Sequence, residues 1–271
     1  MLTAGELVES QGFRYFSIAP TGHAPQIEDQ ARVLYRAPDG LTVTSYEAHA
    51  QGLRFIEPAA SVWETFYVIE GSIACRPSNG AAVTFKTGDL GYRSWEDEAE
   101  LIYSDRLRVI RFFWANDELP PQTGNLTTGP LGAKLSAARS TENTGLNSLH
   151  VFGDQGPSTI YHERPATVRP VDLSPDGRHM SFYGMTPEGV RFRELAGNLG
   201  ETFYLVQGEV RCTPTDTGET IEWKAGDLVY WPYDREFDLE YSAGMGCVCW
   251  FWSDERLPDF TSGANAIEGR S

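Results

Sequence analysis

Four glutamates stand at matching places in two similar stretches of the sequence. Glu57 precedes Glu64, and Glu194 precedes Glu201, at the same spacing. A carboxylate in an apolar interior is costly unless it is paired, protonated or functional. Two carboxylates in one cavity repel each other, so the pKa of one rises and that group can transfer a proton to an organic substrate. The four glutamates are therefore candidate general acids and bases, with Glu201 and Glu194 placed first.

An arginine stands three residues before the first glutamate of each pair, at Arg54 and Arg191. Such a guanidinium could hold an anionic group or a developing oxyanion of the substrate. Two other interpretations remain open at this point. Arg54 could form an ion pair with Glu57 or Glu64 that ties the wall of the domain, or Glu57 and Glu194 could point outward.

The glutamate pairs belong to an internal repeat. "ETFYVIEG", which starts at Glu64, occurs again as "ETFYLVQG" from Glu201, at an offset of 201 − 64 = 137. The same offset relates Cys75 to Cys212. After a one-residue insertion the offset becomes 138, as in the two copies of "GDL" that start at Gly88 and Gly226. One half of the chain is thus expected to be a structural copy of the other.

The repeat predicts two domains, at residues 1–122 and 149–262. A segment rich in Gly, Thr, Ser and Asn at 123–148 is the expected linker, and 263–271 is an expected tail. Inside each copy, short runs rich in Val, Ile, Thr, Phe and Tyr alternate with a period of two and are divided by Gly, Pro, Asp or Asn. This pattern is typical of an all-β sandwich or barrel.

The repeated "E-x6-G" and the "GDL" that follows it resemble the two conserved stretches of the cupin superfamily. The resemblance covers both copies and implies two tandem cupin barrels, each a double-stranded β-helix or jelly roll. The chain resembles the Glu-rich small cupins of the ureidoglycine aminohydrolase and ethanolamine-utilisation type most. Cupins include dioxygenases, isomerases, epimerases, lyases, hydrolases and plain binding proteins, so the resemblance implies a fold rather than a reaction.

Aromatic residues near the repeated motifs are the candidate contacts of a substrate. They lie after "GDL", where cupin substrates commonly meet the barrel, or inside "ETFY", and could pack against a ring or hydrogen-bond a carbonyl. The set comprises Tyr92, Trp95, Tyr230, Trp231, Tyr233, Phe66 and Phe203.

The resemblance also implies where metal ligands would stand, because metal-binding cupins carry His-x-His shortly before the motif glutamate and a later His. These positions are filled by residues other than histidine: Glu57 and Ala59 or Pro58 and Ala60 in the first copy, Glu194 and Ala196 or Leu195 and Gly197 in the second, and residues near Ala99 and Phe237 for the later histidine. Imidazole or thiolate ligands in a preset geometry are what a transition metal requires. We therefore expect no metal and no other cofactor. A carboxylate-rich site that borrows His150 or His162 is the remaining alternative.

Composition limits the partners. The formal net charge is −16 and the pI near 4.7, without a basic stripe, so nucleic acid and anionic membranes are not expected partners. We expect no signal peptide or spanning segment. Four cysteines, including the pair Cys247 and Cys249 on one face of a strand, favour a reducing cytoplasm. A homodimer is a further expectation.

These observations predict a metal-independent bicupin enzyme that acts on a small apolar or aromatic carbonyl metabolite by general acid–base chemistry, through isomerisation, dehydration or cyclisation. An isomerase or lyase is the expected class. The alternatives are a bicupin that only binds a small molecule, and a metal-dependent oxygenase or hydrolase with an atypical site.

Overall fold

The computed structural model describes residues 8–11, 13–18, 29–78, 80–115, 119, 146–150, 159–161, 166–174 and 176–257. All regular elements in these ranges are β-strands. Within them, no helix has the length and apolarity needed to cross a membrane. The expected tail, most of the expected linker and His162 lie outside the described residues.

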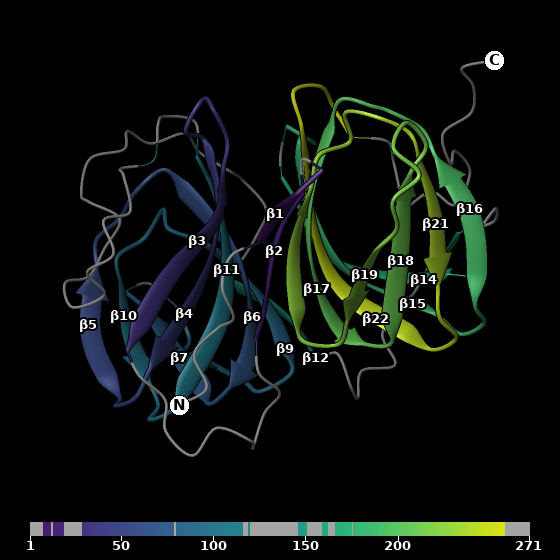
Figure 1. Cartoon of the computed structure of the whole chain (residues 1–271). Helices are drawn as coiled ribbons and strands as arrows, with labels where there is room; N and C mark the ends of the chain where they lie inside the picture. The colour runs from purple at the N-terminus through teal and green to yellow at the C-terminus, as the bar shows by residue number, and fades with distance from the viewer. Residues whose placement is uncertain are drawn as a thin grey trace. The chain divides into compact units, whose positions relative to one another are not determined.

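The chain forms two compact units (Figure 1). The first comprises Met1–Thr3 and Ala19–Asp154, and the second comprises Ala4–Ile18 and Gln155–Ser271. The strands of the first unit are β3 (Gln30–Arg36), β4 (Thr42–His49), β5 (Leu53–Glu57), β6 (Val62–Glu70), β7 (Ser72–Pro77), β8 (Val83–Lys86), β9 (Asp89–Ser94), β10 (Ala99–Tyr103), β11 (Leu107–Ala115) and β12 (Leu146–His150). The strands of the second unit are β1 (Val8–Ser10), β2 (Phe13–Ser17), β13 (Thr159–Tyr161), β14 (Ala166–Leu173), β15 (His179–Thr186), β16 (Val190–Glu194), β17 (Leu199–Gln207), β18 (Glu209–Pro214), β19 (Ile221–Lys224), β20 (Asp227–Trp231), β21 (Phe237–Tyr241) and β22 (Met245–Ser253).

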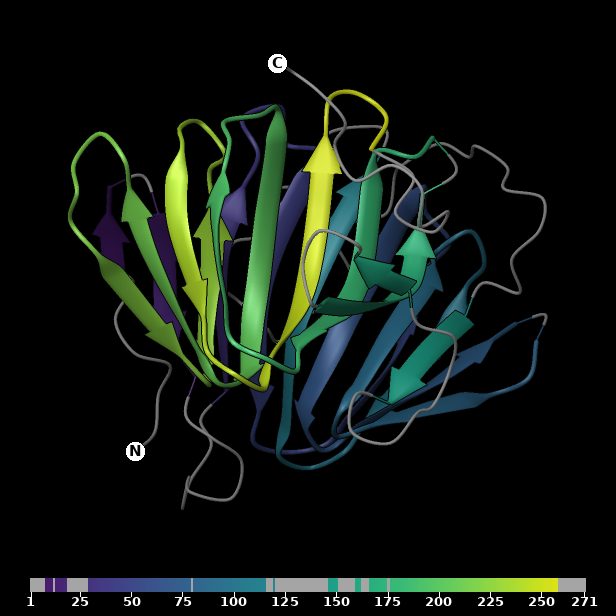
Figure 2. The same ribbon diagram turned by 90° about the vertical axis from the view of Figure 1, so that its right-hand side faces the viewer.

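The two units share one strand topology. The first unit has a sheet of order β12-β9-β6-β11-β4-β3 and a second of order β5-β10-β7-β8. The second unit repeats this pattern in β20-β17-β22-β15-β14 and β16-β21-β18-β19. Figure 2 shows its larger sheet, in which the yellow β22 runs between green strands. Two tandem cupin barrels related by an internal repeat, the predicted fold, are confirmed.

Strand register agrees with the sequence repeat residue by residue. Glu64 lies opposite Phe113 across β6 and β11, and Glu201 lies opposite Phe251 across β17 and β22. Since 113 + 138 = 251, the offset found in the sequence also relates the strand partners. Equivalent residues of the two units can therefore be compared directly.

The glycine that ends the repeated motif is required by the turn after β6 and β17. Gly71 and Gly208 have φ of 85° and 79°, in the region that glycine adopts without steric cost. A Cβ on Gly208 would approach the Met245 Cα to 2.7 Å. The turn allows each strand to reverse into the smaller sheet of its own unit.

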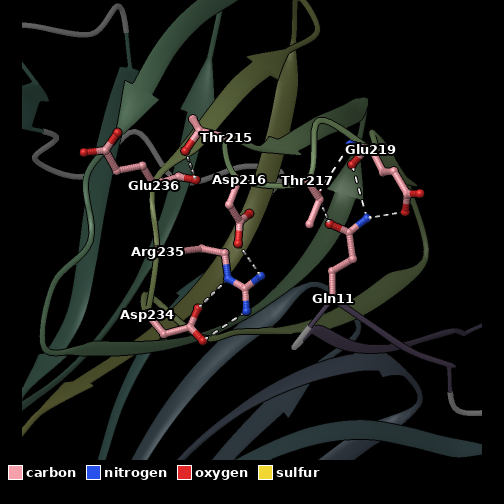
Figure 3. Close-up of polar contacts among 8 residues, drawn as sticks. All are labelled: Gln11, Thr215, Asp216, Thr217, Glu219, Asp234, Arg235 and Glu236. Atoms are coloured by element: carbon pink, nitrogen blue, oxygen red, sulfur yellow. Dashed lines mark hydrogen bonds and ion pairs between the residues drawn. The ribbon is translucent and has the colours of Figure 1, made fainter.

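The first strands of the chain belong to the second unit, although residues 1–122 were expected to form the first barrel. Strand β2 pairs with β20, at the edge position that β12 occupies beside β9 in the first unit. Figure 3 shows Gln11, in the turn after β1, bonded to the loop between β18 and β19: it accepts a hydrogen bond from Thr217 at 2.6 Å and donates one to Glu219. Phe13 is fully buried among Trp223, Trp231 and Phe237. These contacts explain why β1 and β2 belong to the second unit rather than to the domain expected at residues 1–122.

Each barrel encloses side chains from alternate positions of its strands, as the period of two requires. In the first unit the apolar part of this interior includes Phe66, Ile73, Phe85 and Leu101. In the second it includes Phe203, Val210, Trp223 and Leu239. The same alternation brings the motif glutamates to the interior of both barrels.

Candidate functional site

An arginine and two glutamates form a buried ion-pair network inside the first barrel. Arg111 of β11 donates from Nε to Glu64 Oε1 at 2.5 Å, and from Nη1 to Glu47 Oε2 at 3.1 Å. The three residues are at most 8% exposed. His49 Nε2 lies 3.6 Å from the same Glu47 oxygen. The guanidinium thus bonds to both carboxylates that flank it.

A second arginine completes this interior. Arg93 of β9 donates from Nη1 to Glu57 Oε2 at 2.6 Å, and Trp95 donates from Nε1 to Glu64 Oε2 at 3.0 Å. The guanidinium carbon of Arg93 lies 4.7 Å from the centroid of the Trp95 ring. Glu57 and Glu64 therefore face inward, and N–H donors contact both of them.

Burial and charge act in opposite directions on the carboxyls of this network. Burial raises the pKa of Glu47, but the charges and hydrogen bonds of Arg111 and His49 outweigh it, so this pKa lies below its ordinary value of 4.5. For Glu57, burial outweighs the charges of Arg93 and Arg111, and the pKa lies above 4.5. The two carboxyls therefore contribute to stability with opposite dependence on pH.

We expect Glu57→Gln and Glu47→Gln to reveal these opposite contributions. The native state binds the Glu57 proton more tightly than the unfolded state does, so its contribution is present below pH 4.5 and lost as the pH rises through the raised pKa. The Glu47 contribution is present above pH 4.5 and lost as the pH falls through the lowered pKa. A tenfold difference in proton affinity between the folded and unfolded states changes the free energy of unfolding by about 1.4 kcal/mol.

Urea unfolding of wild type and the two variants across pH measures this effect. Relative to Glu57→Gln, the wild type should lose stability as the pH rises above 4.5. Relative to Glu47→Gln, it should lose stability as the pH falls below 4.5. Parallel pH profiles for all three proteins would contradict the assignment.

The second barrel contains a cavity where the first contains the network. Its volume is about 110 Å³, and Glu201, Tyr233, Phe251 and Cys249 are among the residues that line it. Tyr233 donates from its hydroxyl to Glu201 Oε2 at 2.8 Å. Most of the other lining residues are apolar or aromatic, including Phe203. The site is an apolar chamber with a carboxylate and phenol pair on its wall.

Four charged or titratable residues of the first interior are replaced at the equivalent positions of the second. Where the first barrel has Glu47, His49, Arg93 and Arg111, the second has Gly184, Thr186, Trp231 and Cys249. Both motif glutamates are kept: Glu194 is 8% exposed and Glu201 is 6% exposed. The second barrel thus retains the buried carboxyls and replaces both guanidinium groups by smaller or uncharged side chains.

Burial keeps Tyr233 and Cys249 of the cavity wall protonated. It raises the pKa of Tyr233 well above the ordinary value, and the charges of Glu201 and Glu194 raise it further. Burial, the contact with Cys247 and the Glu201 charge likewise raise the pKa of the Cys249 thiol. The sulfurs of Cys247 and Cys249 lie 3.2 Å apart on the cavity wall. Near neutral pH the phenol is a hydrogen-bond donor and Cys249 is a thiol.

Aromatic rings form much of the cavity wall. Phe182 and Phe251 are stacked with centroids 5.3 Å apart and an angle of 18° between the rings. Tyr233 lies 6.3 Å from Phe251, measured between centroids, and also stacks on Trp231. Trp231 itself lies deeper in the core, at 1% exposure. These faces can receive a flat or cationic group.

Arg54 and Arg191 do not reach the interior, which corrects the role expected of them. Arg54 is bonded to Glu100 at 2.5 Å and Arg191 to Glu240 at 2.6 Å, and their side chains are 67% and 76% exposed. Arg54 stands an odd number of residues before the inward-facing Glu57, so the strand places the two on opposite faces. The expected ion pair between Arg54 and Glu57 or Glu64 is therefore also wrong.

The candidate aromatic residues divide between the two faces of their strands. Phe66 and Trp95 lie in the first interior, with Phe66 4.8 Å from Phe85 between ring centroids. Tyr92 lies 6.2 Å from Trp114 between centroids, and Tyr230 stacks at 6.2 Å on Trp252. Because their neighbours in sequence, Arg93 and Trp231, face inward, Tyr92 and Tyr230 lie on the other face and do not line the interior.

Comparisons with known proteins agree with this fold. A family model described as the EutQ-like cupin domain matches residues 185–244, which include Glu194, Glu201 and Tyr233. No curated protein matches the sequence significantly. The structure is similar to protein YlbA from E. coli, with a TM-score of 0.61, 11% identity, and 94% of this chain and 96% of that chain covered.

Two further solved structures are comparably similar. One is a putative glyoxylate-induced protein from Pseudomonas aeruginosa, with a TM-score of 0.61, 12% identity, and 96% and 95% of the two chains covered. The other is HEPD from Streptomyces albus with its substrate 2-hydroxyethylphosphonate and Fe(II) bound, with a TM-score of 0.60, 10% identity, and coverage of 97% and 82%. The chain thus has the cupin fold, residues 185–244 match a cupin family model, and HEPD is an enzyme with a similar fold.

The Fe(II) of that neighbour raises the question of whether either barrel fits a metal. In the first barrel, N–H groups of Arg93, Arg111 and Trp95 donate hydrogen bonds to the carboxylate oxygens of Glu57 and Glu64. A metal ion would need these oxygens as ligands. The described residues of both barrels include no group of three His, Cys, Asp or Glu side chains suited to a metal ion. The donor sets present do not fit a metal centre of the cupin type.

Proposed function

We propose that the second barrel binds a small, largely apolar or aromatic carbonyl metabolite and acts on it by general acid–base catalysis, with Glu201 as the proton-transferring group. The main support for the proposal is the cavity of about 110 Å³, which Glu201 lines next to the Tyr233 hydroxyl. An isomerisation, dehydration or cyclisation needs such a proton transfer beside a carbonyl group.

The size and wall of the cavity support a small apolar substrate. Its volume is somewhat below the roughly 150 Å³ of an engineered apolar cavity that holds benzene. Phe182, Phe203 and Phe251 supply apolar surface around a single carboxylate. The proposal therefore limits the bound part of the substrate to about one small ring or a short branched chain.

Tyr233 and Glu194 have supporting roles in this proposal. The Tyr233 hydrogen bond holds one oxygen of Glu201 at 2.8 Å and so orients the carboxyl group on the cavity wall. Glu194 is buried and its charge acts on Tyr233, so it opposes further negative charge at the site.

Deuterium exchange tests the proposal for any reaction that begins with proton removal beside a carbonyl group. Small aromatic and aliphatic aldehydes and ketones, incubated with the protein in D₂O, should lose protons next to their carbonyl group, as measured by proton NMR. Glu201→Gln should slow the exchange by about 100-fold or more. Glu222→Gln, which changes an exposed carboxylate of the same unit, should leave it unchanged. The absence of exchange with the whole series, or equal rates in Glu201→Gln, would contradict the proposal.

A further inference from the structure

We infer that the ligand of the second barrel carries a cationic nitrogen, as an ammonium, amidinium or guanidinium group, and that this group binds against Glu201 and the aromatic wall formed by Tyr233 and Phe251. The inference rests on the proposed function, because it names the substrate class of the same cavity. It follows from a comparison of the two barrels at equivalent positions.

In the first barrel, two arginine side chains lie at the corresponding place. Arg111 Nε lies 2.5 Å from Glu64 Oε1, and the guanidinium carbon lies 4.8 Å from the centroid of Phe113. Arg93 similarly packs over Trp95. The residues around the two cations are thus three buried glutamates, Glu47, Glu57 and Glu64, and two aromatic rings, which form a cation receptor filled by the chain itself.

The second barrel keeps part of this receptor and replaces the cations, while Gly184 stands in the place of Glu47. Glu64, Phe113 and Trp95 correspond to Glu201, Phe251 and Tyr233, all of which line the cavity. The residue in the place of Arg111 is Cys249, which also lines the cavity. The shorter side chain leaves room where the first barrel has a guanidinium, so a cation supplied by a ligand can take its position.

The hydrogen-bond polarity of the site favours the same class of ligand. The Tyr233 hydroxyl donates its proton to Glu201, so the pair presents acceptor oxygens to the cavity. A ligand N–H⁺ group matches these acceptors and gains a charge-assisted hydrogen bond, which is stronger than a neutral one. The net charge of −16 also attracts cations to the protein as a whole. The carbonyl group of the substrate would be a separate part of the same small molecule.

Ethylguanidinium is a direct probe, because it reproduces the end of an arginine side chain. N-ethylurea is its neutral counterpart of nearly the same shape and size. Isothermal titration calorimetry with the full chain should give at least about tenfold tighter binding of ethylguanidinium than of N-ethylurea. Glu201→Gln should remove this difference, and Glu222→Gln should keep it.

The outcomes separate this inference from the proposed function. Equal binding of both probes, or tighter binding of N-ethylurea, would overturn the cationic ligand and leave a neutral small-molecule site. No binding of either probe would also overturn it. In that case the deuterium-exchange assay still decides on acid–base catalysis by Glu201. A preference for ethylguanidinium that survives in Glu201→Gln would place the cation elsewhere and would equally contradict the inference.

Discussion

Arg111→Ala is expected to lower the free energy of unfolding of the first unit by about 3–5 kcal/mol, the typical cost of removing one partner of a buried ion pair. The loss is large because Glu47 and Glu64 both bond to this guanidinium. Without it, both buried carboxylates would lose a positively charged partner. Urea unfolding measures the change, and hydrogen exchange of the β6 and β11 amides assigns it to the first unit.

A matched variant separates lost charge balance from lost packing. Glu47→Gln, Glu64→Gln and Arg111→Met combined remove the network together and keep similar side-chain volumes. This triple variant should be much more stable than Arg111→Ala, because replacing a whole buried ion pair is often neutral or stabilising. A loss below about 1 kcal/mol in Arg111→Ala, or an equal loss in the triple variant, would show that the network does not hold the barrel together.

The fold could be predicted because the sequence contains the same strand pattern twice. The period-two pattern, the repeated "E-x6-G" and the offset of 137 or 138 define strands whose register the structure reproduces, as in Glu64 with Phe113 and Glu201 with Phe251. The first strands could not be placed in the same way. Phe13 precedes the repeat, and only its packing against Trp223 and Trp231 assigns β2 to the second barrel.

Buried charged residues were predicted only where they repeat. Glu57, Glu64, Glu194 and Glu201 are shared by both copies, and all four are buried. Arg93 and Arg111 were missed because they have no arginine counterpart, although they determine what the first interior contains.

A signal for Arg111 was nevertheless present in the sequence. "RVIRFFW" aligns with "GCVCWFW", so an inward-facing arginine in one copy meets Cys249 in the other. A difference between copies at an inward-facing strand position is therefore as informative as a match. Strand parity is a second signal of this kind: Arg54 and Glu57 are three positions apart on one strand and must lie on opposite faces.

Cys249→Arg is expected to fill the cavity of the second barrel and to weaken ethylguanidinium binding more than about 100-fold, equivalent to roughly 2.7 kcal/mol. The register places residue 249 beside Phe182 and Phe203, as Arg111 stands beside Ser45 and Phe66. An arginine there would reach Glu201 as Arg111 reaches Glu64. Because Phe182 is larger than Ser45, Phe182→Ser combined with Cys249→Arg should fold more readily than Cys249→Arg alone.

Calorimetry with ethylguanidinium measures the loss of binding, and a thermal unfolding scan of each variant shows whether it is folded. Cys249→Ser, which keeps the cavity open and adds no charge, should bind within about threefold of wild type, a difference of less than roughly 0.7 kcal/mol. A folded Phe182→Ser and Cys249→Arg protein that still binds ethylguanidinium as tightly as wild type would show that the cation does not occupy the place of Arg111. Loss of binding with the fold retained would mean that one barrel holds its cation covalently, as arginine, and the other takes it from solution.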